Sequence, residues 1–248
     1  HLVSDSGNNR IKKCWTNSSG TSLLRCSVSA GVGTVSDNEY WGHPRTLAGQ
    51  LHSASGMAWL GSKNRLLVSD TPNTRINMYD SSGTYQGRFP GTNISYGVTG
   101  IATFNDPNIG EGVAVLVGAD ATLPWPYTGD ASLRIYDADG NLEELFNLSY
   151  RTGGLSAPEI GLSTSNTNYP VSVSVHGEGG DEHAVYITSF GNYVWRFDYD
   201  SGSGTLDGNW YAGGPDSAKG NDLGENWSLG PDFFEQGAAG TFDQIGDV

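Results

Sequence analysis

The sequence predicts an all-β fold built from a repeated unit of four short strands. The clearest unit is residues 56–89, where four strand-like runs of four to six residues are separated by turn residues. This unit has no room for a helix. Glycine supplies 36 of the 248 residues without a collagen-like period, which indicates many tight turns. Four antiparallel strands in so short a stretch are typical of one blade of a β-propeller.

The same unit recurs along the chain. Arginines in similar places of the repeats are spaced 65, 59 and 62 residues apart: Arg10, Arg75, Arg134 and Arg196. The last residues, 241–248, are similar to an inner strand alone, whereas residues 1–28 are similar to a unit that lacks this strand. Joining the two segments completes a fourth unit. We therefore expect one domain of four blades, made of residues 241–248 with 1–28, then 53–90, 97–149 and 170–212.

Two architectures satisfy this repeat. In the first, which we favour, the four blades form a closed ring in which the C-terminal strand pairs with the N-terminal one, so that no sheet edge stays free. In the second, the 248 residues are a segment of a longer propeller array. Both architectures predict the same blade.

Two short motifs carry a family resemblance. SDSGNNRI at residues 4–11 and SDTPNTRI at residues 69–76 resemble the repeats of NHL-type β-propellers. The resemblance covers the first two blades and the C-terminal strand. It weakens in the third blade, and in the fourth Ser189 stands where the motif has aspartate. It implies the propeller fold alone, because propellers of this type include enzymes, receptors and scaffolds.

The role of the motif is predicted to be structural. Asp5 and Asp70 are expected to accept backbone N–H groups in the turn, while Gly7 and an asparagine supply a positive φ. The arginine of the motif is expected to pack or pair along a neighbouring strand. A residue that recurs once in each blade shapes the blade more often than it performs chemistry.

Composition and charge narrow the range of partners. With 27 acidic and 13 basic residues the net charge is −14, which argues against binding to a nucleic-acid backbone. No apolar run approaches the roughly 20 residues that a membrane span needs. We therefore expect protein or glycan partners, including other copies of the same chain.

Blade geometry predicts one face with long loops and one face with short turns. The connections on the first face are residues 27–52, 90–97, 119–131, 149–169 and 212–240. Function is expected on this face, because binding residues concentrate on loops held by a rigid scaffold. The candidate binding residues there are Leu123, Trp125, Tyr127, Trp41 and His43. Their aromatic side chains either contact a protein or sugar, or fold onto the top of the propeller.

A channel metal would point to a different function, that of a secreted lactonase- or amidating-lyase-like enzyme, whose propellers resemble this fold. His52 precedes an inner strand and is expected to point toward the channel, but one imidazole does not make the three-ligand site of catalytic zinc. Asp181 and His183 carry suitable atoms in a predicted turn on the opposite face. Acidic residues between 216 and 235 suit Ca²⁺ in type but match no known loop in spacing. We predict no metal, no other cofactor and no catalytic residue.

Sequons and cysteines predict a secreted glycoprotein. Four Asn-x-Ser sequons lie on predicted outer strands or loops: Asn17, Asn93, Asn147 and Asn226. Cys14 and Cys26 flank a turn almost symmetrically, as a cross-strand disulfide would. The expected function is a non-enzymatic extracellular module for protein or glycan interaction or for structure. A filament subunit and a part of a cell-surface assembly are two forms of such a module.

Overall fold

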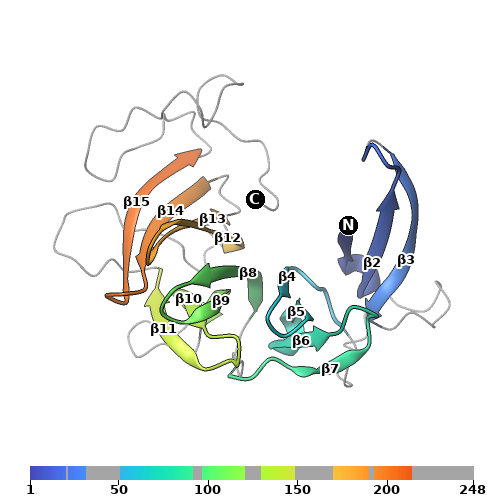
Figure 1. Ribbon diagram of the computed structural model, residues 1–248, viewed down its shortest axis with the longest axis horizontal. Coiled ribbons are helices and arrows are strands. Elements are labelled where there is room, and N and C mark those ends of the chain that lie inside the picture. Colours follow the sequence, from blue (N-terminus) through green and yellow to red (C-terminus); the bar gives the residue numbers. More distant parts are fainter. Residues whose placement is uncertain are drawn as a thin grey trace.

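The protein is a β-propeller arc of four antiparallel sheets. The computed structural model describes residues 1–20, 22–31, 51–91, 97–120, 130–148, 170–189 and 193–213. The sheets, blades one to four in chain order, follow one another around a common axis (Figure 1). The predicted all-β propeller is thus confirmed. In the described ranges no helix has the length and apolar character to cross a membrane.

The strands succeed one another within each blade. Blade one contains β1 (Leu2–Asp5), β2 (Arg10–Thr16) and β3 (Leu23–Gly31), with η1 (Ser6–Asn8) after β1. Blade two contains β4 (Met57–Leu60), β5 (Arg65–Asp70), β6 (Arg75–Tyr79) and β7 (Tyr85–Arg88), with η2 (Thr71–Asn73) after β5. Blade three contains β8 (Val98–Asp106), β9 (Gly110–Asp120), β10 (Asp130–Tyr136) and β11 (Leu142–Asn147). Blade four contains β12 (Pro170–Gly179), β13 (Glu182–Ser189), β14 (Tyr193–Asp200) and β15 (Thr205–Gly213).

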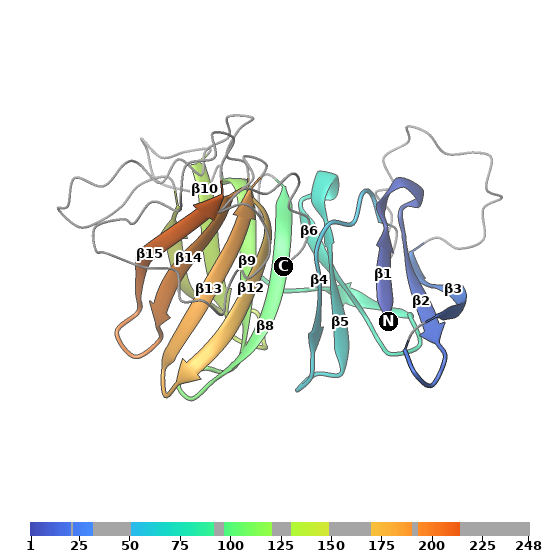
Figure 2. The same cartoon turned by 90° about the horizontal axis from the view of Figure 1, so that it is seen from above.

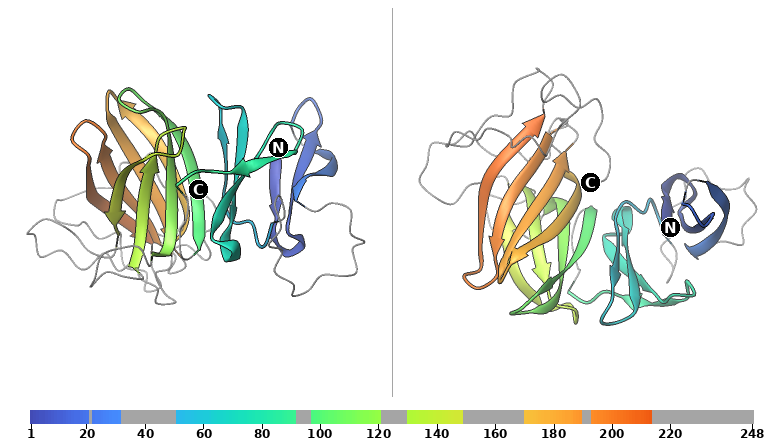
Figure 3. Two further views of the ribbon diagram at one scale, coloured as in Figure 1. Left: turned by 90° about the horizontal axis from the view of Figure 1, so that it is seen from below. Right: turned by 45° about the horizontal axis from the view of Figure 1, so that its top comes forward.

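Blade one has three strands in the described part of the chain, and the other blades have four each. The inner strand that we predict for blade one, residues 241–248, lies outside the described residues. Blades one and four form the two ends of the arc (Figure 3).

The two faces of the arc carry different connections. The turns β4–β5 and β12–β13 lie along one face, and the 3₁₀ helices η1 and η2 lie along the other (Figure 2). This arrangement agrees with the predicted division into a face of short turns and a face of longer connections. Most of each predicted long connection lies outside the described residues.

Apolar cores fill the spaces between neighbouring blades. Within β5, Leu67 belongs to the core between blades two and three, whereas Val68 belongs to the core between blades one and two. Successive side chains of a strand point to opposite faces, so a blade between two neighbours needs apolar residues at consecutive positions. A third core, which includes Leu116 and Val185, joins blades three and four.

The SDTPNTRI motif forms a hydrogen-bonded clasp around Asp70. The buried Asp70 carboxylate accepts hydrogen bonds from Arg75 Nε at 2.7 Å and from Asn73 Nδ2 at 2.9 Å. It also accepts the backbone N–H of His52 at 2.6 Å, which ties the segment before blade two to the motif. The arginine therefore pairs with the aspartate of its own motif.

Blade one has a more open version of this clasp. Asp5 pairs with Arg10 Nε at 2.8 Å and with Lys12 Nζ at 2.7 Å. The Asp5 side chain is 18% exposed, whereas that of Asp70 is 0% exposed. The clasp of blade two is therefore buried, and that of blade one is partly open.

One expectation about the turn of the motif is confirmed and one is wrong. Asn9 supplies a positive φ of 55°, as expected for an asparagine, and Thr74 takes the same position in blade two with a φ of 52°. Gly7 does not have a positive φ, because it lies inside η1 and the left-handed residue comes after the 3₁₀ turn.

The predicted equivalence of the four arginines fails at Arg196. Trp195 and Phe197 both belong to the core between blades three and four. Alternation then places Arg196 on the opposite face of β14. The spacing of the arginines gives the length of the repeat, but it does not determine which face of the blade each arginine occupies.

We predict that Asp70→Ala lowers the free energy of unfolding by about 3–5 kcal/mol, because it removes one partner of a buried ion pair. Asp5→Ala is the matched control, and its loss is expected to be smaller because Asp5 is partly exposed. Urea unfolding of the two variants measures both losses. Equal losses would contradict a special role for the buried clasp.

Candidate functional site

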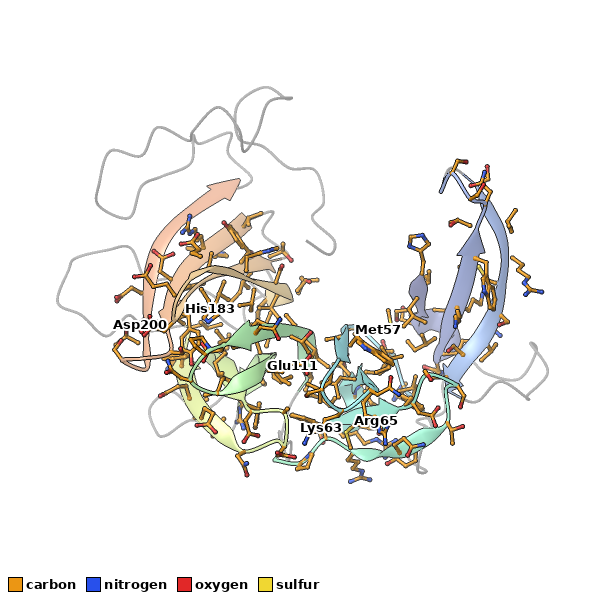
Figure 4. The ribbon with its side chains drawn as sticks, viewed as in Figure 1. Met57, Lys63, Arg65, Glu111, His183 and Asp200 are labelled. Carbon is orange, nitrogen blue, oxygen red and sulfur yellow. A yellow bond between two sulfur atoms is a disulfide. The ribbon has the colours of Figure 1, made fainter. Side chains whose placement is uncertain are left out.

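The inner strands line a cavity of about 370 Å³ at the centre of the arc. Its walls come from β1, β4, β8, β12 and the two residues before β4. Met57, labelled in Figure 4, marks the part contributed by β4. The lining consists of glycine, serine and aliphatic residues, and none of them is ionisable. The described lining offers hydroxyl groups, backbone groups and apolar contacts to a ligand, and among these residues there is no general acid or base.

Two glycines set the narrow spacing of the inner strands. A Cβ on Gly56 would lie 2.9 Å from the backbone nitrogen of Ile101 in the next blade. A Cβ on Gly100 would lie 2.9 Å from the backbone nitrogen of Val173. Because real Cβ atoms do not approach so closely, these positions require glycine, and the centre is built by direct packing of backbones.

The serine hydroxyls of the cavity also connect neighbouring blades. Ser4 Oγ donates to the carbonyl oxygen of Ala54 at 2.6 Å. Ser55 Oγ lies 2.9 Å from Ser69 Oγ and 3.1 Å from the carbonyl oxygen of Val98. These hydroxyls therefore have structural partners, and none forms part of a nucleophile–base pair in the described contacts.

His52 lies before β4, as the sequence predicts, but it does not line the cavity. Its backbone is held by Asp70, and its Nδ1 is buried without a hydrogen-bond partner. Among the residues that the structure describes, no three side chains of His, Cys, Asp or Glu gather as metal ligands. The described part of the channel gives no support to the zinc site of the enzyme alternative.

His183 ties blade four to blade three. Its Nε2 lies 2.6 Å from Oδ2 of Asp106, and the two side chains are 1% and 0% exposed. The imidazole ring contacts the rings of Phe104 at 4.9 Å and Tyr199 at 5.9 Å, measured between centroids. An imidazole enclosed in this way acts as an inter-blade contact (Figure 4).

The predicted turn around Asp181 and His183 is shorter than expected. β12 continues to Gly179 and β13 begins at Glu182, so His183 belongs to a strand and Asp181 to the turn. The carbonyl oxygen of Asp181 accepts the N–H of Ser201 at 3.0 Å. The structure therefore does not bring these weak metal candidates together.

The pKa of Asp106 is lower than the ordinary value of an aspartate. Burial raises this pKa, but the hydrogen bonds to the carboxylate outweigh the burial. The donors are the Ser201 hydroxyl, the backbone N–H groups of Ile109 and Asn108, and the His183 imidazole. The carboxylate is consequently ionised at neutral pH and held in place by groups from two blades.

Glu111 forms a second inter-blade contact, beside Lys63 (Figure 4). Its two carboxylate oxygens accept the backbone N–H groups of Gly61 at 2.7 Å and Ser62 at 2.6 Å. Burial raises the pKa of Glu111, but hydrogen bonds from Ser62 and Gly61 lower it below its ordinary value. Lys63 Nζ lies 2.6 Å from Asp139 across the same interface, in an exposed pair that contributes little.

Sequence reasoning missed Asp106 and Glu111. Both lie at the hairpin between β8 and β9, where an acidic residue alone gives no signal. Asp106 has partners in its own hairpin and in blade four, and those of Glu111 lie in blade two, so the contacts between blades depend on the packing of the arc.

The predicted disulfide between Cys14 and Cys26 is present. The two cysteines are directly opposite each other in β2 and β3, with a Cα–Cα distance of 4.1 Å. They are the two cysteines of the sequence, so the chain has no free thiol.

The described sequons lie at accessible positions. Asn17 is partly exposed in the turn between β2 and β3, where its Oδ1 accepts the N–H of Ser22 at 3.2 Å. Asn147 is the partly exposed last residue of the outer strand β11. Asn93 and Asn226 lie outside the described residues.

The candidate binding loops also lie outside the described residues, as does the acidic segment proposed for Ca²⁺. These are Leu123, Trp125, Tyr127, Trp41 and His43, and residues 216–235. Their predicted roles stay predictions.

The described part of blade one is basic although the chain as a whole is acidic. Residues 1–31 contain one acidic and four basic residues, giving a net charge of +3, whereas the other residues sum to −17. The basic residues are Arg10, Lys12, Lys13 and Arg25. Two of these cations contact the Trp15 ring: Arg25 Cζ at 4.6 Å and Lys13 Nζ at 5.8 Å from its centroid. The net charge of the whole chain does not show this separation of basic and acidic residues.

Neither a scan against models of protein families nor a search of curated proteins gave a match. Similar solved structures include BBS1N in complex with ARL6DN, with a TM-score of 0.40, 11% identity, and coverage of 84% of this chain and 51% of that one. A nidogen/laminin complex gives a TM-score of 0.36, 13% identity, and coverage of 81% and 89%. The WD40 repeats of RRP9 give a TM-score of 0.28 and 13% identity, with coverage of 84% of this chain and 78% of that one.

The chain spans about half the length of the BBS1N chain, 51%. At these TM-scores the similarities assign no function, which has to be argued from the residues of this chain. The NHL type of the repeats stays a prediction.

Replacing both cysteines by serine is expected to lower the free energy of unfolding by about 3 kcal/mol, because the disulfide restricts the unfolded chain. Thermal unfolding with and without a reducing agent measures the effect. The reductant should lower the melting temperature of the native protein and leave the double variant unchanged. A native protein insensitive to full reduction would contradict the prediction.

Asp106→Asn should lower the free energy of unfolding at pH 7 by about 1–3 kcal/mol, because buried hydrogen bonds to a charged acceptor are weakened. Since the pKa of folded Asp106 is depressed, its contribution is present above the pKa of the unfolded carboxyl, about 3.9, and disappears as the pH falls through the folded pKa. The stability difference between native protein and variant should therefore shrink in acid.

Urea unfolding at pH 7 and below pH 4 checks this prediction. Asp207→Asn, at an exposed position of β15, is the control. A stability difference that stays constant across this range would show that the charge of Asp106 is unimportant.

Proposed function

We propose that this chain is a non-enzymatic module of a secreted glycoprotein, built on an NHL-type propeller, that acts by binding other proteins. The observation that carries this proposal is the placement of ionisable groups. The cavity lining has none, whereas Asp70 holds the motif of blade two in place and Asp106, Glu111 and His183 form contacts between blades. Active sites place titratable groups with perturbed pKa values in a cleft, and the described cavity does not have this arrangement.

Two features support an extracellular location. The Cys14–Cys26 disulfide is of the kind that persists in oxidising compartments. Asn17 and Asn147 are partly exposed, at a hairpin turn and on an outer strand, where a glycan can be accommodated without disturbing a core.

The segregation of charge supports self-assembly as one form of protein binding. In every copy residues 1–31 carry a net charge of +3 and the other residues sum to −17. Opposite charges on different copies attract and orient an encounter, which suits a filament subunit or a part of a cell-surface assembly. Trp125 and Tyr127 remain candidates for contact with a glycan.

Metal content tests the proposal against the enzyme alternative. Protein purified without chelators is analysed for zinc and calcium, and we expect substoichiometric amounts of both. A stoichiometric metal whose removal abolishes a lactonase or lyase activity would overturn the proposal.

Secretion from eukaryotic cells tests the glycoprotein part. Asn17→Gln and Asn147→Gln should each reduce the mass of the secreted protein by one N-glycan, because each removes a partly exposed acceptor. Asn105→Gln, at an exposed asparagine outside any sequon, is the control and should leave the glycan mass unchanged. Intact-mass measurement before and after enzymatic deglycosylation gives the result, and a secreted native protein without glycans would contradict it.

A further inference from the structure

A further cavity, of about 250 Å³, lies between blades one and two. β1 begins on the same face of the arc as the β4–β5 turn, which is the face of short turns (Figure 2). The cavity lies at this end of the two blades, because its lining includes the start of β1, residues on both sides of the β4–β5 turn and the start of the β6–β7 turn. Unlike the central cavity, it is lined by ionisable groups as well as by apolar ones.

The clefts between the other blades are bridged at this end. Glu111 of blade three accepts two backbone N–H groups of the β4–β5 turn, and Asn108 Nδ2 of blade three donates to Ser201 Oγ of blade four at 3.0 Å. The cleft between blades one and two contains the cavity instead. The β6–β7 turn packs directly on β3 beside it, because a Cβ on Gly83 would overlap the carbonyl oxygen of Ser29.

The repeat shows why this cleft is open at Lys13. Alignment of SDSGNNRI with SDTPNTRI places Lys13 of β2 at the position of Met78 in β6. Met78 packs against the apolar core between blades two and three. Lys13 is exposed and lines the cavity, because an ammonium group that entered a core would lose its hydration. A cation therefore stands where blade two has an apolar residue.

No described carboxylate neutralises this cation. The ammonium of Lys13 lies 5.8 Å from the centroid of the Trp15 ring, and the ion pairs between described residues do not include it. The adjacent Lys12 pairs with Asp5 at 2.7 Å and does not line the cavity. Neighbours along a strand point to opposite faces, so the two lysines have different surroundings although they carry the same charge. Lys13 is consequently able to bind an anion in the cavity.

An exposed indole lies in the opposite wall. Trp59 of β4 is 42% exposed and lies opposite Leu66 of β5, which belongs to the core between blades one and two. Counted from the two glycines that set the spacing of the inner strands, Trp59 corresponds to Thr103 of blade three. Thr103 Oγ1 donates to the carbonyl oxygen of Trp59 at 3.1 Å. A short side chain therefore fits this position of the repeat, whereas blade two presents a large aromatic surface to the cavity.

Polar groups complete the lining, from Ser29, Asp80 and Ser81. The Ser82 hydroxyl donates to Asp80 Oδ1 at 2.6 Å and the Thr84 N–H donates at 2.9 Å, which holds the carboxylate in one orientation. These hydrogen bonds from Ser82 and Thr84 lower the pKa of Asp80, so the group is ionised at neutral pH. The cavity therefore offers an ammonium group to an acid and a fixed carboxylate to hydroxyl donors.

We propose that this cavity binds one hexuronic acid residue of a glycan. Lys13 binds the sugar carboxylate, Trp59 packs against the apolar face of the ring, and Asp80 accepts hydroxyl groups. The volume of about 250 Å³ is below the roughly 300–1,000 Å³ of sites for drug-sized ligands, which suits a single sugar ring. An acidic amino-acid side chain would satisfy Lys13 but has no hydroxyl group for Asp80. The site lies on the face opposite the long connections, so it is separate from the candidate binding loops.

Two substitutions taken from the repeats test the site. Lys13→Met copies Met78 of blade two, and Trp59→Thr copies Thr103 of blade three. Each variant therefore introduces a side chain that the fold already accommodates at that position. Lys12→Met removes the same charge from the adjacent position and is the matched control. Ligand-observed NMR titration measures the binding of methyl β-D-glucuronide and methyl β-D-glucoside to each protein.

We expect the native protein to bind the glucuronide at least about tenfold more tightly than the glucoside, because the neutral sugar loses a charged hydrogen bond to Lys13. Lys13→Met should abolish this preference, and Trp59→Thr should weaken the binding of both sugars. Lys12→Met should bind as the native protein does. Equal binding of the two sugars by the native protein, or equal losses in the two lysine variants, would overturn the proposal.

Two other acids distinguish a sugar from other ligands of Lys13. Acetate carries the acid group alone, and N-acetylaspartate methylamide represents an acidic peptide. Neither should displace the glucuronide at equal concentration, because neither has both a pyranose ring and hydroxyl groups. Displacement by acetate would show a simple anion site, and displacement by the blocked aspartate would show a peptide site. Either result would overturn the assignment to a glycan and would leave the proposed binding of other proteins unaffected.

Discussion

The blades of this propeller are held by apolar cores between neighbours, and the interior blades use both of their faces for these cores. Leu67 and Val68 serve two different cores from consecutive positions of one strand. A blade alone would expose one of these sets to water, at about 25 cal/mol for each Å² of apolar surface. Polar contacts between blades add to these cores, through Glu111 and through the pair of Asp106 with His183.

The same packing explains where charged residues lie. Near the axis the backbones approach too closely for side chains at Gly56 and Gly100, so the lining is small and neutral. Carboxylates are placed at turns and between blades, where N–H donors hold them ionised. Blade one departs from this pattern, because it combines a positive charge, an open clasp at Asp5 and an exposed apolar edge.

Much of the fold could be predicted because the repeat is local. A strand pattern, turn residues and the motif around Asp70 lie within one blade, and Cys14 and Cys26 are 12 residues apart. The contacts between blades could not be predicted in this way. Asp106 and His183 are separated by 77 residues, and the sequence around either residue does not predict contact with the other. The repeat predicts the wrong face for Arg196, because a repeat length fixes the position of a residue along the chain but not the face of the strand on which it lies.

The central claim is that the buried pair of Asp106 and His183 helps to hold blades three and four together. A double-mutant cycle between Asp106→Asn and His183→Gln, read by urea unfolding at pH 7, tests it most directly. The account predicts an interaction energy of about 0.5–3 kcal/mol between the two positions, as expected for groups that contact each other in a folded core. Additive losses of stability, with no interaction energy, would contradict it.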